Sequence, residues 1–412
     1  MMMNSVANAA QPAGSRKPFA LAVVAAVVAG ACTFLNVYCT QPLLPLLQGL
    51  FHASELEVSL TVGLVTLSVA LAAPWVGLVA ESIGRKKVIV PALFAMGVVT
   101  LLTATAQTLH GLMVWRFLQG LFVPGVIAVI MAYINEEFPE RAGTVMSAYV
   151  AGTVFGGFLG RFLTGLMAVH GNWRMAFLVL GGLDLAGALA VRAWLPLATH
   201  FVPAKDVFKS FRDTWGHLQN ARLLAVCGMG FTVLFSLVGV FTYVNFYLAG
   251  RPFGLNPAAL GSIFFVYLLG CVVTPLAGRF LDRFGFRRTA LLSVSMSLTG
   301  LFLTLLPSLA AVIAGLAVFS SGIFISQSAA SVLTGRVAEG ARSAAAGLYV
   351  TCYYTGGSVA AVLTAWFWLR GGWPACVGLF AVASLTTLGF SILGGRKAAT
   401  VKPTGPVVDT AI

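Results

Sequence analysis

The feature that most constrains this chain is its succession of long stretches that carry almost no charge. They follow one another from Phe19 to near the C-terminus, and runs of about 18 or more apolar residues suit a bilayer. Only 9% of the 412 residues are charged and 59% are hydrophobic, whereas a soluble domain carries about 25% charged residues. The sequence therefore predicts an all-α membrane protein and excludes a water-soluble domain.

The apolar stretches fall into two sets of six predicted transmembrane helices. The first set covers about 18–47, 56–80, 88–107, 109–135, 143–169 and 173–196. The second set covers about 221–249, 257–281, 289–307, 309–334, 343–369 and 373–394. The domains that we expect are a cytoplasmic tail 1–17, an N-terminal six-helix bundle 18–196, a central cytoplasmic loop 197–219, a C-terminal six-helix bundle 220–395 and a cytoplasmic tail 396–412.

Lys and Arg residues are distributed unevenly between the two sides of these helices. With the N-terminus inside, twenty of the 25 lie on the cytoplasmic side, and only Arg174, Arg251 and Arg370 lie outside. The positive-inside rule therefore predicts that both termini are cytoplasmic. The net charge of +13 does not indicate nucleic-acid binding, because the basic residues form short clusters between apolar runs.

The two sets of helices also repeat each other in sequence. Segment 77–88 matches segment 278–289 at an offset of 201, and farther along the matches are offset by 200. The matched pairs are Gly77 and Gly278, Glu81 and Asp282, Gly84 and Gly285, Tyr149 and Tyr349, Gly156 and Gly356, and Trp173 and Trp373. Two halves of the same topology imply a pseudo-two-fold axis along the membrane normal.

Segment 77–87 resembles the loop between helices 2 and 3 of the major facilitator superfamily, which reads G-x-L-a-D-r-x-G-r-k. Glu81 and Ser82 replace the usual Asp and Arg, whereas the second copy keeps Asp282 and Arg283. The run from Arg116 through Gln119 to Gly120 is similar to the R-x-x-q-G of the drug:proton antiporter branch.

The fifth predicted helix carries glycines in a pattern similar to the G-x3-G-P-x2-G-G of the same branch. The pattern here is Gly152, Gly156, Gly157 and Gly160, with Arg161 following and Gly157 in place of the proline. Together with Tyr38-Cys-Thr-Gln-Pro42 and Asn172-Trp-Arg174, it resembles the YnfM-like branch. Glycines four residues apart also predict close packing on a neighbouring helix.

The resemblance implies a major facilitator fold, with twelve transmembrane helices in two pseudo-symmetric six-helix bundles. It implies a monomeric transporter in the bacterial inner membrane that couples efflux of small organic molecules to protons by alternating access. Proton-coupled uptake is the alternative, and a receptor or channel is more remote because no filter-like loop is present. The histidines are isolated and no phosphate-binding loop occurs, so we expect no enzyme activity, no cofactor and no metal site.

The repeated loops are candidates for a cytoplasmic gate. The candidate residues are Gly77, Glu81, Gly84, Arg85, Gly278, Asp282, Gly285 and Arg287. Gly77 would let helices approach closely, and Glu81 could accept hydrogen bonds from a helix N-terminus or pair with an Arg. Such a latch would close the inside of the outward-facing state. The alternative is an ordinary charged turn.

Three charged residues lie deep in the predicted helices, namely Arg116, Arg161 and Asp184. Charge in hydrocarbon is costly, so each is a functional candidate, which we assign to proton coupling. For Arg116, that role is what the resemblance implies. Their repeat partners are the uncharged Ala317, Ala361 and Ser384. We therefore expect coupling to reside in the N-terminal half.

Each of these charges has a structural alternative. Arg116 stays protonated, so it would tune a neighbour or hold an anion, or it would only tether Gln119 or a backbone carbonyl. Asp184 could bind and release a proton. It could instead form a static ion pair with Arg161, because helices 5 and 6 place the two within about 6 Å in depth.

Polar and aromatic residues of the predicted cavity helices suit an amphipathic small molecule with few charges. They are Asn36, Tyr38, Gln41, Gln119, Tyr243, Asn245, Tyr247, Gln327, Tyr349, Tyr353 and Tyr354. For any one of them, hydrogen bonding between helices or an interfacial position explains the residue equally well. These helices offer no acidic residue to hold a cation, so we expect neutral or anionic substrates.

Overall fold

The computed structural model describes residues 19–170, 172–198, 220–337 and 342–395. Both predicted tails, and nearly all of the predicted central loop, lie outside these ranges. The elements of the N-terminal half are α1 (Phe19–Val37), η1 (Gln41–Leu43), α2 (Leu44–Phe51), α3 (Glu55–Ile83), α4 (Arg85–Thr103), α5 (Leu109–Phe122), α6 (Pro124–Glu137), η2 (Pro139–Arg141), α7 (Ala142–Val169) and α8 (Trp173–Trp194). Those of the C-terminal half are α10 (Ala221–Ala249), α11 (Pro257–Ile263), η3 (Phe264–Leu268), α12 (Leu269–Leu303), α13 (Leu309–Val337) and α14 (Arg342–Gly395).

Within the described ranges, ten stretches are long and apolar enough to cross a membrane. Two of them, of 47 and 51 residues, are about twice as long as a bilayer needs. Each contains non-helical backbone, at Gly285 in α12 and at Gly371 and Gly372 in α14. Dividing these two stretches at their breaks agrees with the twelve helices expected, and the all-helical membrane fold is confirmed.

Capping side chains fix where several helices begin. Ser54 and Glu57 form a capping box at the start of α3, in which each side chain accepts a hydrogen bond from the other residue's backbone N–H. Thr108 caps α5 and Asn256 caps α11 in the same position. These caps satisfy N–H groups that have no partner within the helix.

The sequence repeat is also a repeat of contacts. In each half, a Cβ added at one glycine would meet a Tyr ring, and a Cβ added at a second glycine would overlap the backbone of a neighbouring helix. The pairs are Gly30 with Tyr149 and Gly156 with Ala31 in the first half, and Gly230 with Tyr349 and Gly356 with Phe231 in the second. Helix α1 therefore packs on α7 as α10 packs on the first part of α14.

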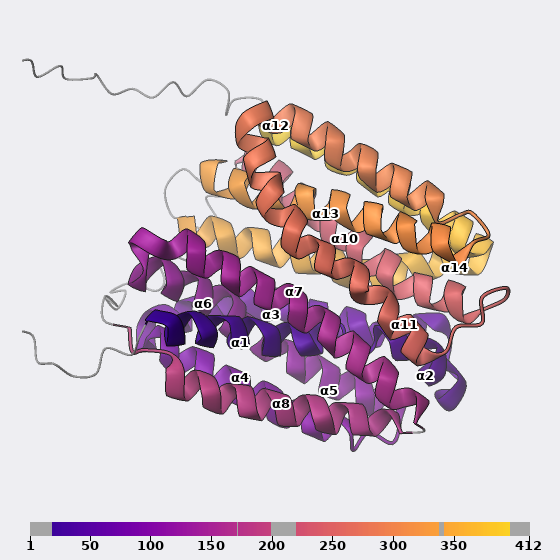
Figure 1. Ribbon diagram of the computed structural model, residues 1–412, viewed down its shortest axis with the longest axis horizontal. Coiled ribbons are helices and arrows are strands. Elements are labelled where there is room, and N and C mark those ends of the chain that lie inside the picture. The colour runs from indigo at the N-terminus through magenta and orange to yellow at the C-terminus, as the bar shows by residue number, and fades with distance from the viewer. Residues whose placement is uncertain (1–18, 171, 199–219, 338–341, 396–412) are drawn as a thin grey trace, which may run out of the picture.

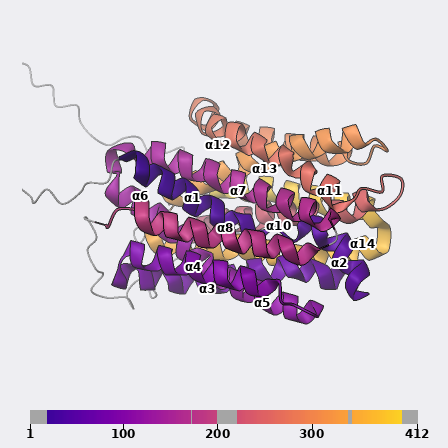
Figure 2. The same cartoon turned by 60° about the horizontal axis from the view of Figure 1, so that its bottom comes forward.

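The two halves lie side by side, with their helices running roughly along the same direction (Figure 1). The described chain begins and ends at one end of the bundle, which we call the terminal end (Figure 2). There Phe19 packs on Phe138 with ring centroids 5.5 Å apart, and Gly395 lies beside Phe286. The opposite end, which holds α2 and α11, is called the distal end.

The halves are packed together in the distal part of the bundle. A Cβ at Gly165 would overlap the carbonyl oxygen of Pro257, and one at Gly63 would lie 2.7 Å from the Cβ of Ala361. At the terminal end, a Cβ at Gly77 or Gly278 would meet nothing within 4 Å. The structure therefore has its halves in contact at the distal end and open space beside these two gate-loop glycines.

Candidate functional site

Residues 38–43 interrupt the first membrane-crossing helix between α1 and α2. Here the backbone bonds run to the third residue back, from Gln41 N to Tyr38 O at 3.1 Å and from Leu43 N to Thr40 O at 2.9 Å. Pro42 has no N–H, which favours such tightening. The carbonyls of Val37 and Cys39 thereby lose the donors that a regular α-helix would supply four residues on.

Side chains from other helices bond to these two carbonyls. Arg116 Nη2 donates to Val37 O at 2.7 Å, and Thr164 Oγ1 donates to Cys39 O at 2.7 Å. The fully buried Arg116 also donates to Thr61 O at 3.2 Å and to Gln119 Oε1. The tethering contacts considered for Arg116 are therefore present, and they join α5 to α1 and α3.

Asp184 of α8 lies at the other end of a hydrogen-bonded network. The side-chain amide of Asn36 donates to Asp184 Oδ2, and Thr100 Oγ1 lies 3.2 Å from Asn36 Oδ1 and 3.5 Å from Asp184 Oδ2. Gln119 Nε2 donates to Thr100 Oγ1 at 2.5 Å. The network thus connects the carboxyl of Asp184 to Arg116 through three uncharged side chains on α1, α4 and α5.

The carboxyl of Asp184 is incompletely satisfied. Asp184 is fully buried, and within the described part of the chain its Oδ1 has no hydrogen-bond partner. The static ion pair with Arg161 is not formed, because the bonds of Arg161 run to Gln41 and Gly157 instead. A buried carboxyl oxygen without a donor is costly, and most costly when it carries charge.

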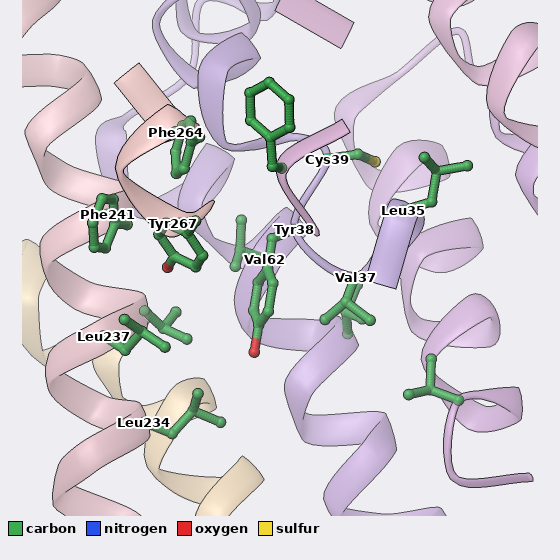
Figure 3. Packing of buried hydrophobic residues seen from close by; sticks show 14 of the residues in the cluster. Leu35, Val37, Tyr38, Cys39, Val62, Leu234, Leu237, Phe241, Phe264 and Tyr267 are labelled. Carbon is green, nitrogen blue, oxygen red and sulfur yellow. The ribbon is translucent and has the colours of Figure 1, made fainter. Parts of the chain in front are cut away.

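Arg161 of α7 lies where the two halves meet. Its guanidinium carbon is 4.6 Å from the ring centroids of both Phe264 and Tyr267, on η3 of the C-terminal half, and 4.8 Å from that of Tyr38. Figure 3 shows Tyr267 and Phe264 on one side of Tyr38. The three rings surround a buried cation, an arrangement that stabilises a guanidinium by about 2 kcal/mol or more when desolvated.

Gln41 extends this contact to a second helix of the C-terminal half. Its Oε1 accepts a hydrogen bond of 2.7 Å from Arg161 Nε, and its Nε2 donates to Thr242 Oγ1 on α10 at 3.1 Å. Both groups of the amide are therefore used, and the residue is buried. We call Arg161, Gln41, Thr242, Phe264 and Tyr267 the distal clamp.

The gate residues expected from sequence are placed in two equivalent loops. Gly84 and Gly285 both have positive φ, of 101° and 77°. Arg85 donates to Glu136 of α6 at 2.6 Å, within the N-terminal half. Asp282 and Arg287 are exposed, and the side chain of Glu81 lies outside the described part of the structure. The latch remains a prediction for another conformation.

The predicted cavity residues separate into three groups. Asn36 and Gln119 belong to the Asp184 network, and Tyr38 and Gln41 contact Arg161. In a second group, near the distal end, Tyr243 OH donates to Ala361 O, Asn245 to Phe241 O, and Tyr247 stacks on Trp373. In a third group, Tyr349 OH donates to Gln327 Oε1 at 3.4 Å and its ring stacks on Tyr353, which in turn contacts Tyr354.

Four residues of the network and the clamp were not expected from sequence. They are Thr100, Thr242, Phe264 and Tyr267. Single hydroxyl and aromatic residues are frequent along these helices and do not by themselves indicate a site. Only the aromatic cluster at residues 264–267 could have been singled out from the sequence. Among the residues described, no group of three or more His, Cys, Asp or Glu side chains is placed to hold a metal ion.

The glycine pattern of the fifth predicted helix is confirmed as a packing surface. A Cβ at Gly152, Gly156 or Gly160 would overlap the backbone of α1 at Val27, Ala31 or Leu35, respectively. These contacts hold α7 directly against α1. They fix the position of Arg161, which follows Gly160, relative to residues 38–43.

Comparison with known proteins identifies the family of this fold. The model of the Major Facilitator Superfamily matches residues 26–270 and 248–407. The chain is 34% identical to the inner membrane transport protein YnfM of Escherichia coli over 357 residues, 85% of each chain. It is 32% identical to the uncharacterized MFS-type transporter YybF of Bacillus subtilis over 365 residues, 88% of this chain and 90% of that one.

A solved structure shows the same fold. The human organic anion transporter MFSD10 superposes with a TM-score of 0.71 at 16% identity, covering 92% of this chain and 99% of that one. The family match and the curated relatives show that the chain is a multi-pass membrane protein that transports a small-molecule substrate and is not an enzyme. The chain belongs to the Major Facilitator Superfamily, whose members are secondary transporters that work by alternating access.

Proposed function

We propose that this protein exports small organic molecules across the bacterial inner membrane in exchange for protons. The observation that carries the proposal is the buried carboxyl of Asp184, whose Oδ1 lacks a partner and whose Oδ2 is bonded into the network that ends at Arg116. A carboxyl whose surroundings differ between two conformations can bind a proton in one and release it in the other, whereas Arg does not release its proton.

The arrangement suits a neutral Asp184 in this conformation. A carboxylate would spread its charge over both oxygens and would leave Oδ1 without any donor, whereas a neutral carboxyl leaves only an unpaired hydroxyl or carbonyl oxygen. Asp184 would therefore be ionised in a conformation in which a further donor reaches it. Arg116 would contribute by fixing Gln119 and, through it, Thr100.

The orientation of the protein in the membrane rests on charge. The excess of Lys and Arg on one side favours cytoplasmic termini, and the terminal end is then the cytoplasmic end. The structure would accordingly be closed towards the outside. The name of the relative YnfM supports the inner membrane as the location. The same cycle run in reverse would give proton-coupled uptake, which is the second candidate function.

The two buried guanidinium groups favour neutral or anionic substrates. Arg116 and Arg161 are both fully buried, and with Asp184 neutral they leave a positive field inside the N-terminal half. A cationic substrate would be repelled by this field. We propose a monomer as the functional unit, since each chain contains both halves of the alternating-access unit.

Flux in proteoliposomes tests the proposal by screening classes of compound rather than one chosen substrate. Purified protein is reconstituted with an internal pH dye, a pH gradient is imposed, and sugars, organic acids and amphipathic drugs are added in turn. Antiport predicts that at least one compound accumulates against its gradient and that proton movement follows it. Accumulation in the direction of proton flow would favour uptake, and transport with no proton movement would refute coupling.

A further inference from the structure

Two buried amides lie at the interruption of the first membrane-crossing helix and face in different directions. Asn36 lies just before residues 38–43, and its side chain bonds to Asp184 and Thr100 within the N-terminal half. Gln41 lies inside the interruption, and its side chain bonds to Arg161 and to Thr242 of the C-terminal half. Only four residues separate Asn36, which bonds to the proton site, from Gln41 of the distal clamp.

We infer that Asn36 and Gln41 are positioning residues that transmit the protonation state of Asp184 to the distal clamp through residues 38–43. This inference rests on the proposed proton coupling and deepens it. It assigns the regulation of the contact between the halves to two side chains that are not themselves ionisable. It also predicts a direction: proton binding at Asp184 favours a closed distal end, and proton release favours an open one.

The first step of the transmission is a choice of hydrogen-bond acceptor. The hydroxyl of Thr100 has one hydrogen and three acceptors nearby, namely Met96 O at 2.7 Å, Asn36 Oδ1 at 3.2 Å and Asp184 Oδ2 at 3.5 Å. One of the two lone pairs of this hydroxyl accepts from Gln119. When Asp184 becomes ionised, its carboxylate is the strongest acceptor for this hydrogen and for the Asn36 amide. Asn36 loses the donor to its own Oδ1 as a result.

The second step depends on the weak helix at residues 38–43. Bonds to the third residue back have poorer geometry than those of an α-helix, and two carbonyls at the interruption depend on Arg116 and Thr164 for their donors. A change in the position of Asn36 can therefore alter the winding here at little cost. Because Gln41 belongs to this segment, its bonds to Arg161 and Thr242 change with the winding.

The ionisable groups around Asp184 leave it as the group that changes charge. On the first membrane-crossing helix, the thiols are those of Cys32, whose sulfur lies 4.0 Å from Leu183 O, and of Cys39. On α4, the face packed against it presents Gly97 and Thr100, which do not ionise. The buried guanidinium groups of α5 and α7, Arg116 and Arg161, stay protonated. Three histidines, His52, His110 and His170, lie toward the distal end outside the network, so the variant Asp184→Asn decides whether a pH-dependent change at the clamp comes from Asp184.

The test measures the separation of the halves at the distal end as a function of pH. Spin labels are attached through non-natural ketone residues at the exposed Gln107 and Ser308, which leaves the native cysteines in place. Distances are recorded in full-length protein in lipid nanodiscs. A single linked proton changes the ratio of closed to open molecules by at most about tenfold per pH unit. Wild-type protein is expected to show the short distance enriched in acid.

Asn36→Ala and Gln41→Ala are the decisive variants. Both are expected to lose most of the pH dependence although Asp184 is unchanged, and Gln41→Ala is expected to populate the long distance at every pH. Thr33→Val is the matched control, because Thr33 is a buried α1 side chain that bonds only its own helix at Ala29 O.

The outcomes separate this inference from the proposed function. If Asp184→Asn removes the pH dependence while Asn36→Ala and Gln41→Ala keep it, the transmission through residues 38–43 is wrong and proton coupling stands. If wild-type protein shows no pH dependence at all, proton coupling itself fails, and the inference with it. Should Asn36→Ala not fold, Asn36→Ser and Gln41→Ala carry the same test.

Discussion

The side-chain amide of Asn36 donates a hydrogen bond to the carboxyl of Asp184, which lies 148 residues farther along the chain. This contact joins the first and sixth membrane-crossing helices inside the N-terminal half. The sixth helix thereby supplies an acidic group to the first, which also contacts the C-terminal half through Gln41. Asp184 is thus linked through the first helix to the contact between the halves.

Asp184→Asn is expected to abolish substrate-dependent proton movement while the protein still folds. The amide is similar in size to the carboxyl and can still accept from the Asn36 amide, but it cannot bind and release a proton. The measurement is proton flux in proteoliposomes, with substrate exchange driven by a substrate gradient as the second readout. Exchange should persist but more slowly than in wild type, because the permanently neutral side chain favours the closed distal end while substrate binding does not require the titrating group.

Asp282→Asn serves as the control for this variant, because Asp282 is an exposed acid in the gate loop of the other half. It should leave the number of protons moved per substrate unchanged. A loss of folded protein in Asp184→Asn, with Asp282→Asn intact, would show instead that the carboxyl is needed for structure.

Gly156→Ala is expected to destabilise the protein. The added Cβ would overlap the backbone of α1 at Ala31, and backbone cannot move aside as a flexible side chain can. Overpacking of this kind costs about 1–3 kcal/mol, occasionally more. Thermal unfolding in detergent should show a lower midpoint. Gly182→Ala on α8, where a Cβ would meet nothing within 4 Å, should be neutral, and equal effects at both sites would contradict the packing role.

The fold was predictable because bilayer thickness and the positions of charge leave few alternatives. Long apolar runs define the helices, and the glycines repeated at offsets of 200 and 201 define how the halves correspond. The breaks at Gly285 and at Gly371 and Gly372 lie where turns were expected, although the chain is otherwise helical through them. Hydrophobic length, together with the positions of charge and of the repeated glycines, thus predicted the helices and their order.

The site was only partly predictable, because sequence gives depth along a helix but not rotation about its axis. Arg161 and Asp184 were expected at similar depth, and yet Arg161 faces Gln41 and Asp184 faces Asn36. The tightening at residues 38–43 decides which carbonyls need donors. Pro42 indicates a break in the helix, but the sequence does not show that Arg116 donates to Val37 O, because this depends on how α5 packs.

Arg161→Lys is expected to loosen the distal clamp. An ammonium cannot stack as a guanidinium does, and it cannot hold the Gln41 oxygen with the same geometry. Lysine keeps part of a cation–π contact worth about 2 kcal/mol or more, and the loss of the remainder would raise the open population several-fold. The labelling rate of a cysteine introduced at the buried Ile263 of α11 measures this opening from the distal side.

Arg174→Lys is the matched control for the clamp. Arg174 also stacks on an aromatic ring near the distal end, at 4.6 Å from the ring centroid of Trp173, but both residues belong to the N-terminal half. Labelling at position 263 should be unaffected by this change. Equal increases in both variants would indicate a general loosening of the protein and would count against a clamp between the halves.

Gly84→Ala and Gly285→Ala are expected to destabilise this conformation to a similar extent. Both glycines occupy backbone regions, φ 101° with ψ 147° and φ 77° with ψ 171°, that are essentially restricted to glycine. Forcing a Cβ there costs about 1–3 kcal/mol. Thermal unfolding should therefore report a lower midpoint for each variant, and similar losses would follow from the equivalence of the two loops.

Gly77→Ala and Gly278→Ala test a different property of the same loops. A Cβ at either position meets open space in this conformation, so the unfolding midpoint should not fall. If the latch forms when the halves meet at the terminal end, the same Cβ atoms would then obstruct the close approach, and transport should slow while stability is kept. Loss of stability here, or undiminished transport, would remove the reason to assign these glycines to a gate.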